Sequence, residues 1–92
     1  MKKIPKQVKV GGHVFKIIDK NTQNLMGQID EDYNTIYINP KAPLSQQWAT
    51  LVHEAMHSMN TTLSGGHNFS HALLDSLSEQ IYAFLSDNKL LK

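Results

Sequence analysis

The sequence lacks cysteine and arginine, and it contains no long hydrophobic run. Without cysteine there are no disulfides, no thiolate zinc sites and no cysteine nucleophile, a composition that suits a reducing cytosol. No segment approaches the roughly 20 apolar residues that span a bilayer. No apolar stretch of about 7–15 residues follows the N-terminal lysines, as it would in a secretory signal. We therefore expect a soluble, cytoplasmic protein with no membrane partner.

The charge is nearly balanced, at +1 from nine lysines and eight acidic residues. Four of the lysines, Lys2, Lys3, Lys6 and Lys9, crowd the N-terminus. Such a segment is either a basic arm for nucleic acid or another anionic surface, or a solubilising end of the chain. We favour the second interpretation because no arginine or aromatic residue accompanies these lysines. Nucleic acid is therefore not an expected partner.

The most informative segment is His53-Glu54-Ala55-Met56-His57. Residues four apart on a helix share one face, with Cβ atoms about 5–6 Å apart. Two neutral imidazoles so placed can bind one metal ion at about 2.0–2.1 Å. Glu54 directly follows the first histidine and can take a proton from metal-bound water. The segment predicts half of a zinc hydrolase site, with His53 and His57 as ligands of one Zn²⁺ per chain and Glu54 as the general base.

The surroundings of this motif favour a ligand-bearing helix. The apolar residues recur at helical spacing and form one stripe. They are Trp48, Leu51, Val52, Ala55, Met56, Met59 and Leu63. His53 and His57 lie well away from the middle of that stripe. The alternative interpretation is an amphipathic helix with two solvent-exposed histidines and an unrelated glutamate between them.

The first half of the chain is typical of strands. Segments 7–10 and 13–18 flank Gly11-Gly12, which predicts a hairpin with a two-residue turn. Segments 26–30 and 35–39 flank a four-residue turn and predict a second hairpin. Within it, Thr35–Ile38 is the strongest strand of the chain because it is β-branched and aromatic throughout.

Two helices follow. The first begins between residues 43 and 46, with Pro43 suited to the first helical position, and the glycines at 65 and 66 end it near Leu63. The second begins at Asn68 or Ser70 and runs to about Asp87. Strands followed by helices predict an α+β fold, with both helices on one face of a small antiparallel sheet of three to four strands. The chain is long enough for one small domain, residues 1–92.

A catalytic zinc usually has three protein ligands and one water, so a third ligand is needed. The second helix offers Asp75 and Glu79. The apolar residues of this helix form one stripe, made of Leu73, Leu74, Leu77, Ile81, Phe84 and Leu85. Asp75 falls on the flank of that stripe, where a residue can face a neighbouring helix, whereas Glu79 falls almost opposite it. Side-chain length favours Glu79, because glutamate reaches further. The residues alone leave this choice open.

The chain resembles gluzincin-type zinc metallopeptidases, and most closely the small phage and prophage proteins related to the ImmA/IrrE metallopeptidases. The resemblance covers nearly the whole chain. It rests on Gly11-Gly12-His13, Gly27-Gln28-Ile29-Asp30, Thr35-Ile36-Tyr37-Ile38, the motif segment 50–57 and the late helix 77–88. It implies a zincin-like fold and hydrolysis of peptide bonds in a peptide or protein substrate.

The resemblance also implies a ligand set. In that family the third ligand is a glutamate, often followed four positions later by an asparagine or an acid. Laid on this chain, the ligand position is Asp75 and the follower is Glu79. An aspartate here departs from the family pattern. We expect Asp75 to ligate and Glu79 to support a ligating histidine, the alternative being that Glu79 ligates and Asp75 supports.

Three further residues are candidates for stabilising the oxyanion of a tetrahedral intermediate, namely Tyr82, His71 and His67. The sequence does not distinguish among them. His67 is also a weaker candidate for the third ligand. The resemblance further implies that an extended peptide binds an edge strand beside the motif helix, which we assign to Thr35–Ile38.

Two other function classes remain open. One is a catalytically silent zinc-binding interaction or regulatory module. The presence of Glu54 disfavours it, because a purely structural zinc site does not need that residue. The other is a nucleic-acid accessory protein that uses the lysine-rich arm.

ImmA/IrrE relatives cleave helix-turn-helix repressors but carry further domains, so that substrate does not transfer to this chain. The sequence is silent on the oligomeric state and on whether the tail from Lys89 to Lys92 covers the cleft.

Overall fold

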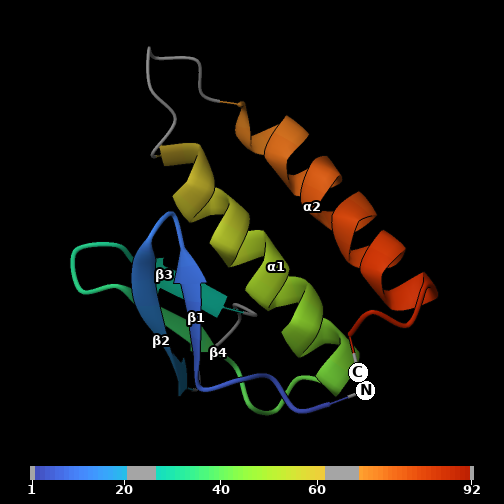
Figure 1. Cartoon of the computed structure of the whole chain (residues 1–92), viewed down its shortest axis with the longest axis horizontal. Coiled ribbons are helices and arrows are strands. Elements are labelled where there is room, and N and C mark those ends of the chain that lie inside the picture. Colours follow the sequence, from blue (N-terminus) through green and yellow to red (C-terminus); the bar gives the residue numbers. More distant parts are fainter. Residues whose placement is uncertain (1, 21–26, 62–68, 92) are drawn as a thin grey trace.

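Four strands precede two helices along the chain (Figure 1). The computed structural model describes residues 2–20, 27–61 and 69–91. The elements are β1 (Gln7–Val10), β2 (His13–Asp19), β3 (Gly27–Asp30), β4 (Thr35–Ile38), α1 (Leu44–Thr61) and α2 (His71–Asp87). The predicted α+β class is therefore confirmed. None of the helices in the described ranges is both long and apolar enough to cross a membrane.

Both predicted hairpins form. β1 pairs antiparallel with β2 through a turn in which Gly11 and Gly12 have φ of 58° and 84°. Two successive residues with positive φ are what a two-residue turn between twisted strands requires, and glycine adopts such φ without a steric cost. β3 pairs antiparallel with β4, with Ile29 opposite Ile36.

The sheet is mixed, so the expectation of an antiparallel sheet is wrong. Its order is β1-β2-β4-β3, and β2 pairs parallel with β4, with Ile17 beside Ile36. The physical reason lies in the composition of the last two strands. Ile36 and Ile38 of β4 are fully buried, which favours a central position, whereas β3 is short and polar and takes the edge. Thr35–Ile38 is consequently paired on both sides and cannot be the open strand we expected to bind a peptide.

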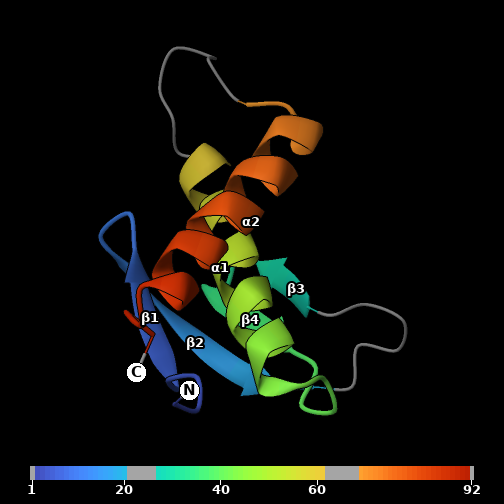
Figure 2. The ribbon, with the colours of Figure 1, turned by 90° about the vertical axis from the view of Figure 1, so that its right-hand side faces the viewer.

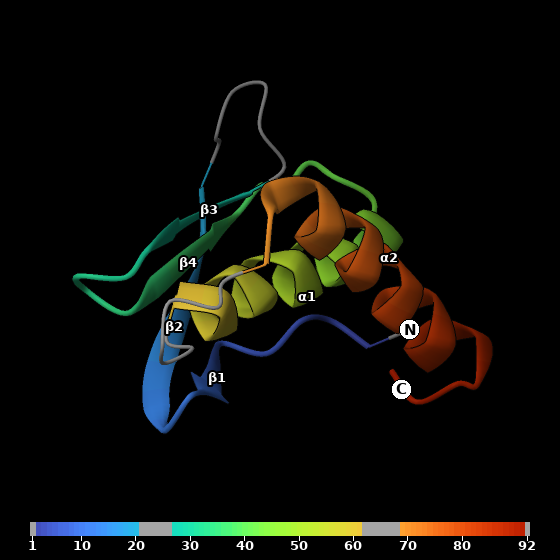
Figure 3. The ribbon, with the colours of Figure 1, turned by 90° about the horizontal axis from the view of Figure 1, so that it is seen from above.

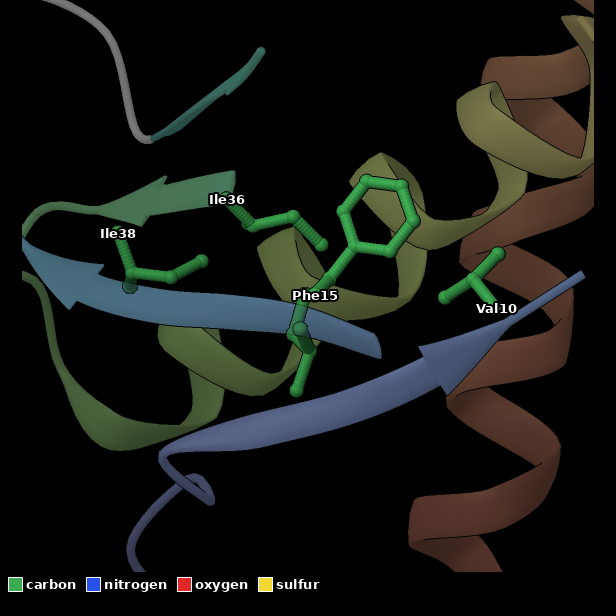
Figure 4. Close-up of a cluster of buried hydrophobic side chains, with 5 residues drawn as sticks. Val10, Phe15, Ile36 and Ile38 are labelled. Atoms are coloured by element: carbon green, nitrogen blue, oxygen red, sulfur yellow. The ribbon is translucent and has the colours of Figure 1, made fainter. Parts of the chain in front are cut away.

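The hydrophobic core lies between the sheet and α1. It contains Val10, Phe15, Ile36, Ile38 and Leu51 (Figure 4). Trp48 and Ala55 of α1 pack against this cluster from the helix side. The indole Nε1 of Trp48 also donates a hydrogen bond of 2.6 Å to the carbonyl oxygen of Lys2, which ties the N-terminal segment to α1.

The molecule has three layers, with α1 between the sheet and α2 (Figure 3). Among the elements described, α2 contacts α1 and no strand. Leu74 is therefore buried, whereas Leu73 and Phe84 of α2 are 51% and 61% exposed. The sequence placed all three on one apolar face, and the structure buries the part of it that meets α1.

Local signals determine the helix ends. α1 begins at Leu44, within the expected range of 43 to 46. Pro43 stands one position before the helix and not at its first position, and its carbonyl accepts a hydrogen bond from the Gln47 backbone N–H. Ser70 is the N-cap of α2, and its Oγ accepts from the Leu73 backbone N–H at 3.2 Å, as the sequence predicts. The end of α1 expected near Leu63 lies outside the described residues.

The end of α1 is bonded to the segment before α2 through one side chain. Asn60 accepts a hydrogen bond of 2.8 Å from the Phe69 backbone N–H and donates one of 3.1 Å to the Phe69 carbonyl. The amide thus satisfies both backbone groups of a residue nine positions later. This pair ties the residue before the α2 N-cap to the end of α1.

β3 lies directly against α1 at Gly27. A Cβ atom at this position would stand 2.5 Å from the Thr50 Cγ2 and 2.8 Å from the Tyr37 carbonyl oxygen. Both distances are below van der Waals contact. The glycine is therefore required for the edge strand to approach the helix that carries the motif.

We expect Gly27→Ala to destabilise the protein by about 1–3 kcal/mol, the usual cost of overpacking a filled site. Urea unfolding followed by circular dichroism measures this change. Gln28→Ala, at the exposed neighbouring residue, is the matched control and should be close to neutral. The double variant Gly27→Ala/Thr50→Ser removes one of the two obstructing atoms and should recover part of the loss. Equal stability of Gly27→Ala and wild type would contradict the close packing.

Candidate metal centre

α1 presents two histidines to α2. α2 packs against α1 (Figure 2). His53 and His57, one turn apart on α1, both lie close to Asp75 of α2 and therefore face the second helix. Their side chains are 35% and 18% exposed, and the two rings meet edge to face with centroids 4.5 Å apart. The predicted pair of imidazoles is thus formed on one helix face.

Asp75 of α2 completes a group of three ligand atoms. Its Oδ1 lies 2.5 Å from the His53 Nε2 and 3.7 Å from the His57 Nε2, and the two Nε2 atoms are 3.0 Å apart. In a tetrahedral zinc site with bonds of about 2.0–2.1 Å, ligand atoms stand about 3.3–3.4 Å apart. Small rotations of the three side chains would bring their ligand atoms to these distances. His53, His57 and Asp75 could therefore hold a metal ion.

The charges of this group suit metal binding. The hydrogen bond from His53 holds the pKa of the Asp75 carboxyl below its usual range, with smaller contributions from the charges of the neighbouring histidines. Burial lowers the pKa of His57, and the nearby imidazoles of His53 and His71 lower it further. Near neutral pH the aspartate is thus ionised and His57 is neutral, and these are the forms that bind a metal.

Glu54 is buried beside this group, at 8% exposure. Its Oε1 lies 3.6 Å from the His53 Nδ1, on the ring edge away from the Nε2 that faces Asp75. Burial raises the pKa of the Glu54 carboxyl, an effect that the neighbouring His53 partly offsets. The carboxylate is therefore a stronger base than an exposed glutamate would be.

An open groove of about 880 Å³ borders the group on one side. α1 and α2 contribute His57 and His71 to its wall, and the facing wall comes from the sheet. The residues on that wall are Lys20, Gln28, Ile29, Asp30, Glu31, Asp32 and Tyr37. The free edge of β3 thus runs along a groove that reaches the candidate ligands.

A smaller pocket of about 350 Å³ borders the group on the other side, between the two helices. It contains His53, Asp75 and Glu79, together with the buried hydroxyls of Thr50 and Ser78. Glu79 shares this pocket, but the structure gives it no hydrogen bond or ion pair with either histidine of the group. Its expected supporting contact is not seen.

The remaining candidates are placed differently. The His71 ring lies 5.0 Å from the His57 ring, centroid to centroid, and lines the groove. Tyr82 is half-buried on α2 and lines neither the groove nor the smaller pocket. His67 lies outside the described residues.

Sequence reasoning missed the part of the site that β3 contributes. Its residues line the groove because β3 is the edge strand, and the pairing order that puts it there leaves no local signal in the sequence. The buried polar residues Thr50, Glu54 and Ser58 did carry a signal. They recur every four residues on α1, a polar stripe beside the apolar one.

No family model, curated protein or solved structure matches the chain.

We expect His53→Ala, His57→Ala and Asp75→Ala each to abolish stoichiometric metal binding, because each removes one of three converging ligand atoms. Elemental analysis after equilibration with zinc measures this loss. Glu79→Ala is the matched control on α2, and it should weaken zinc binding by no more than the about 10–100-fold typical of a lost supporting partner. Full zinc content in Asp75→Ala with none in Glu79→Ala would reverse the assignment.

We expect Glu54→Gln to stabilise the metal-free protein near neutral pH, because the amide avoids the cost of burying a charge. The folded-state pKa is raised, so wild-type stability falls as the pH rises from the unfolded-state value of about 4.5 through the folded-state value. The stability difference between variant and wild type should therefore be smallest near pH 4 and grow above it, as thermal unfolding at several pH values would measure. A difference independent of pH would refute this account of Glu54.

Proposed function

We propose that the protein is a zinc-dependent peptidase of the gluzincin type, related to the ImmA/IrrE metallopeptidases. The observation that carries this proposal is the convergence of the two Nε2 atoms and the Asp75 carboxylate beside an open groove. Two imidazoles and one carboxylate form a donor set that zinc favours. Three protein ligands with one open side are typical of a catalytic rather than a structural zinc site.

The edge strand supports a peptide substrate. β3 pairs with β4 on one side, and its other edge has no strand partner in the described sheet. An extended peptide can add to such an edge through backbone hydrogen bonds, without requiring a particular sequence. The peptide would then lie along the groove wall, opposite His57 and His71. β3 thus takes the role that the sequence analysis assigned to Thr35–Ile38.

The proposed chemistry divides among a few groups. His53, His57 and Asp75 would hold the zinc ion, which would supply Lewis acidity for the scissile carbonyl and the attacking water. Glu54 accepts a proton from that water and passes it to the leaving amine. The raised pKa of Glu54 supports the acceptor role. Of the three candidates for stabilising the oxyanion, we assign His71, because it lines the groove next to His57.

One observation favours a second candidate function, a catalytically silent metal-binding module. Glu54 faces the Nδ1 of His53 and does not line the groove. A carboxylate in that position can orient a ligating histidine. In that case Glu54 would hold the metal site together and would not act on water.

The test is hydrolysis of a pool of unstructured peptides by zinc-loaded protein, with new N-termini identified by mass spectrometry. Wild type should cleave, and Glu54→Gln should keep its zinc while losing at least about 100-fold in kcat/KM, as expected for loss of a general base. His71→Ala should lower kcat more than it raises KM, and His71→Gln, which keeps a donor, should retain more activity.

The controls separate the two candidate functions. Loss of zinc affinity in Glu54→Gln, together with an inactive wild type, would favour the silent module. Equal turnover by Glu54→Gln and wild type would reject Glu54 as the base. Hydrolysis that survives in His53→Ala without zinc would reject the metal-dependent reaction altogether.

A further inference from the structure

One face of the sheet carries no covering element in the described structure. Both helices lie on the opposite face (Figure 3). Strand alternation points Phe15 and Ile17 of β2 toward α1 and leaves Val14, Lys16 and Ile18 on the open face. On the neighbouring strands the register adds Lys9 beside Val14 and Tyr37 beside Ile18. We call this surface the open sheet face.

The open sheet face is basic, although the protein as a whole is nearly neutral. Lys9, Lys16 and Lys20 on or beside it are all exposed. Among the outward positions of the four described strands, the one acidic residue is Asp30, on the outer strand β3. The remaining acids lie on the inner face, in the β3–β4 turn or on the helices. Lys9 and Lys16 thus gather positive charge on β1 and β2, whereas Lys20 lines the groove together with Asp30, Glu31 and Asp32.

Apolar and aromatic groups lie between these lysines. Val14 and Ile18 are 45% and 42% exposed, unusually accessible for β-branched residues on a strand. The Nζ of Lys20 sits 4.6 Å from the centre of the Tyr37 ring. This cation–π contact holds an ammonium group over an aromatic face at the edge of the patch.

We propose that the open sheet face binds single-stranded nucleic acid. Lysines that track a phosphate backbone and an aromatic side chain on which a base stacks are the two components of such surfaces. The charge complementarity argues for an anionic polymer, and the apolar residues favour one with exposed bases. A lipid surface fits less well, since Val14 and Ile18 are short β-branched side chains, and membrane binding relies on large apolar side chains that insert.

Each group has a defined role in this proposal. Lys9 on β1 and Lys16 on β2 contact phosphates of the bound single strand. Val14 and Ile18, between these lysines, contact its sugar and base carbons. Lys20 leaves the Tyr37 ring for a phosphate when a base stacks there. Three phosphate contacts predict a log–log salt dependence of the binding constant with a slope of about −2 for a single strand. Lys9, Val14, Lys16 and Ile18 lie outside the groove, whereas Lys20 and Tyr37 also line it. None of these residues is a candidate metal ligand, so the proposal does not depend on the proposed function.

The test is fluorescence anisotropy of labelled oligothymidylate with the zinc-loaded protein, at 20–200 mM salt. We expect binding that Lys9→Gln/Lys16→Gln/Lys20→Gln weakens at least about tenfold and that Tyr37→Leu weakens about 5–100-fold, the range for losing one base stack. The matched control is Lys2→Gln/Lys3→Gln/Lys6→Gln, which removes three charges from the N-terminal segment and should weaken binding less than about threefold. Zinc content and thermal unfolding verify that each variant is folded.

Several outcomes would overturn the proposal. Equal losses in the two triple variants would mean that lysine charge attracts the polymer without a defined surface. Binding to vesicles of anionic phospholipid with none to oligothymidylate would assign the face to a membrane. Tighter binding to a duplex than to the single strand would remove the role of stacking. No binding at 20 mM salt would reject the proposal outright.

Discussion

The candidate site depends on helix α1 being packed between the sheet and α2 at the same time. Its apolar residues fill the core under the sheet, and Leu51 belongs to the central cluster. Its opposite side carries His53 and His57 and meets α2. A third stripe, with Glu54 at its centre, is buried against β3 at Gly27. One helix therefore positions the two imidazoles, the candidate base and the groove wall, and any tilt of it would displace all of them together.

Much of this arrangement could be predicted because its signals are local. Gly11-Gly12 specifies a tight turn, Ser70 specifies the start of α2, and the i, i+4 spacing puts His53 and His57 on one face. The strand order could not be predicted, since pairing β2 with β4 rather than with β3 depends on how much of each strand is buried in the finished fold. The edge strand was misassigned for that reason. The choice between Asp75 and Glu79 needed the actual rotation of α2 against α1.

The position of Glu54 links stability to chemistry. A buried carboxylate costs folding energy, and the same burial strengthens it as a base. The close contact of Gly27 with α1 maintains that burial, because the strand lies directly over the Glu54 side chain. Such a conflict between local stability and the placement of an ionisable group is common where a fold carries a reactive site. It also explains why a glycine, unfavourable in most strands, occupies this position.

The hydrogen-bonded pair of Asn60 and Phe69 ties the start of α2 to the end of α1, the two helices that carry the candidate metal ligands. The entry point of α2 is held by the amide of Asn60, and so it does not depend on how many residues connect the helices. A variant with a longer or different segment between these two residues could thus keep His53, His57 and Asp75 in position. For protein engineering, the segment between Asn60 and Phe69 is accordingly a place where a new binding loop could be grafted.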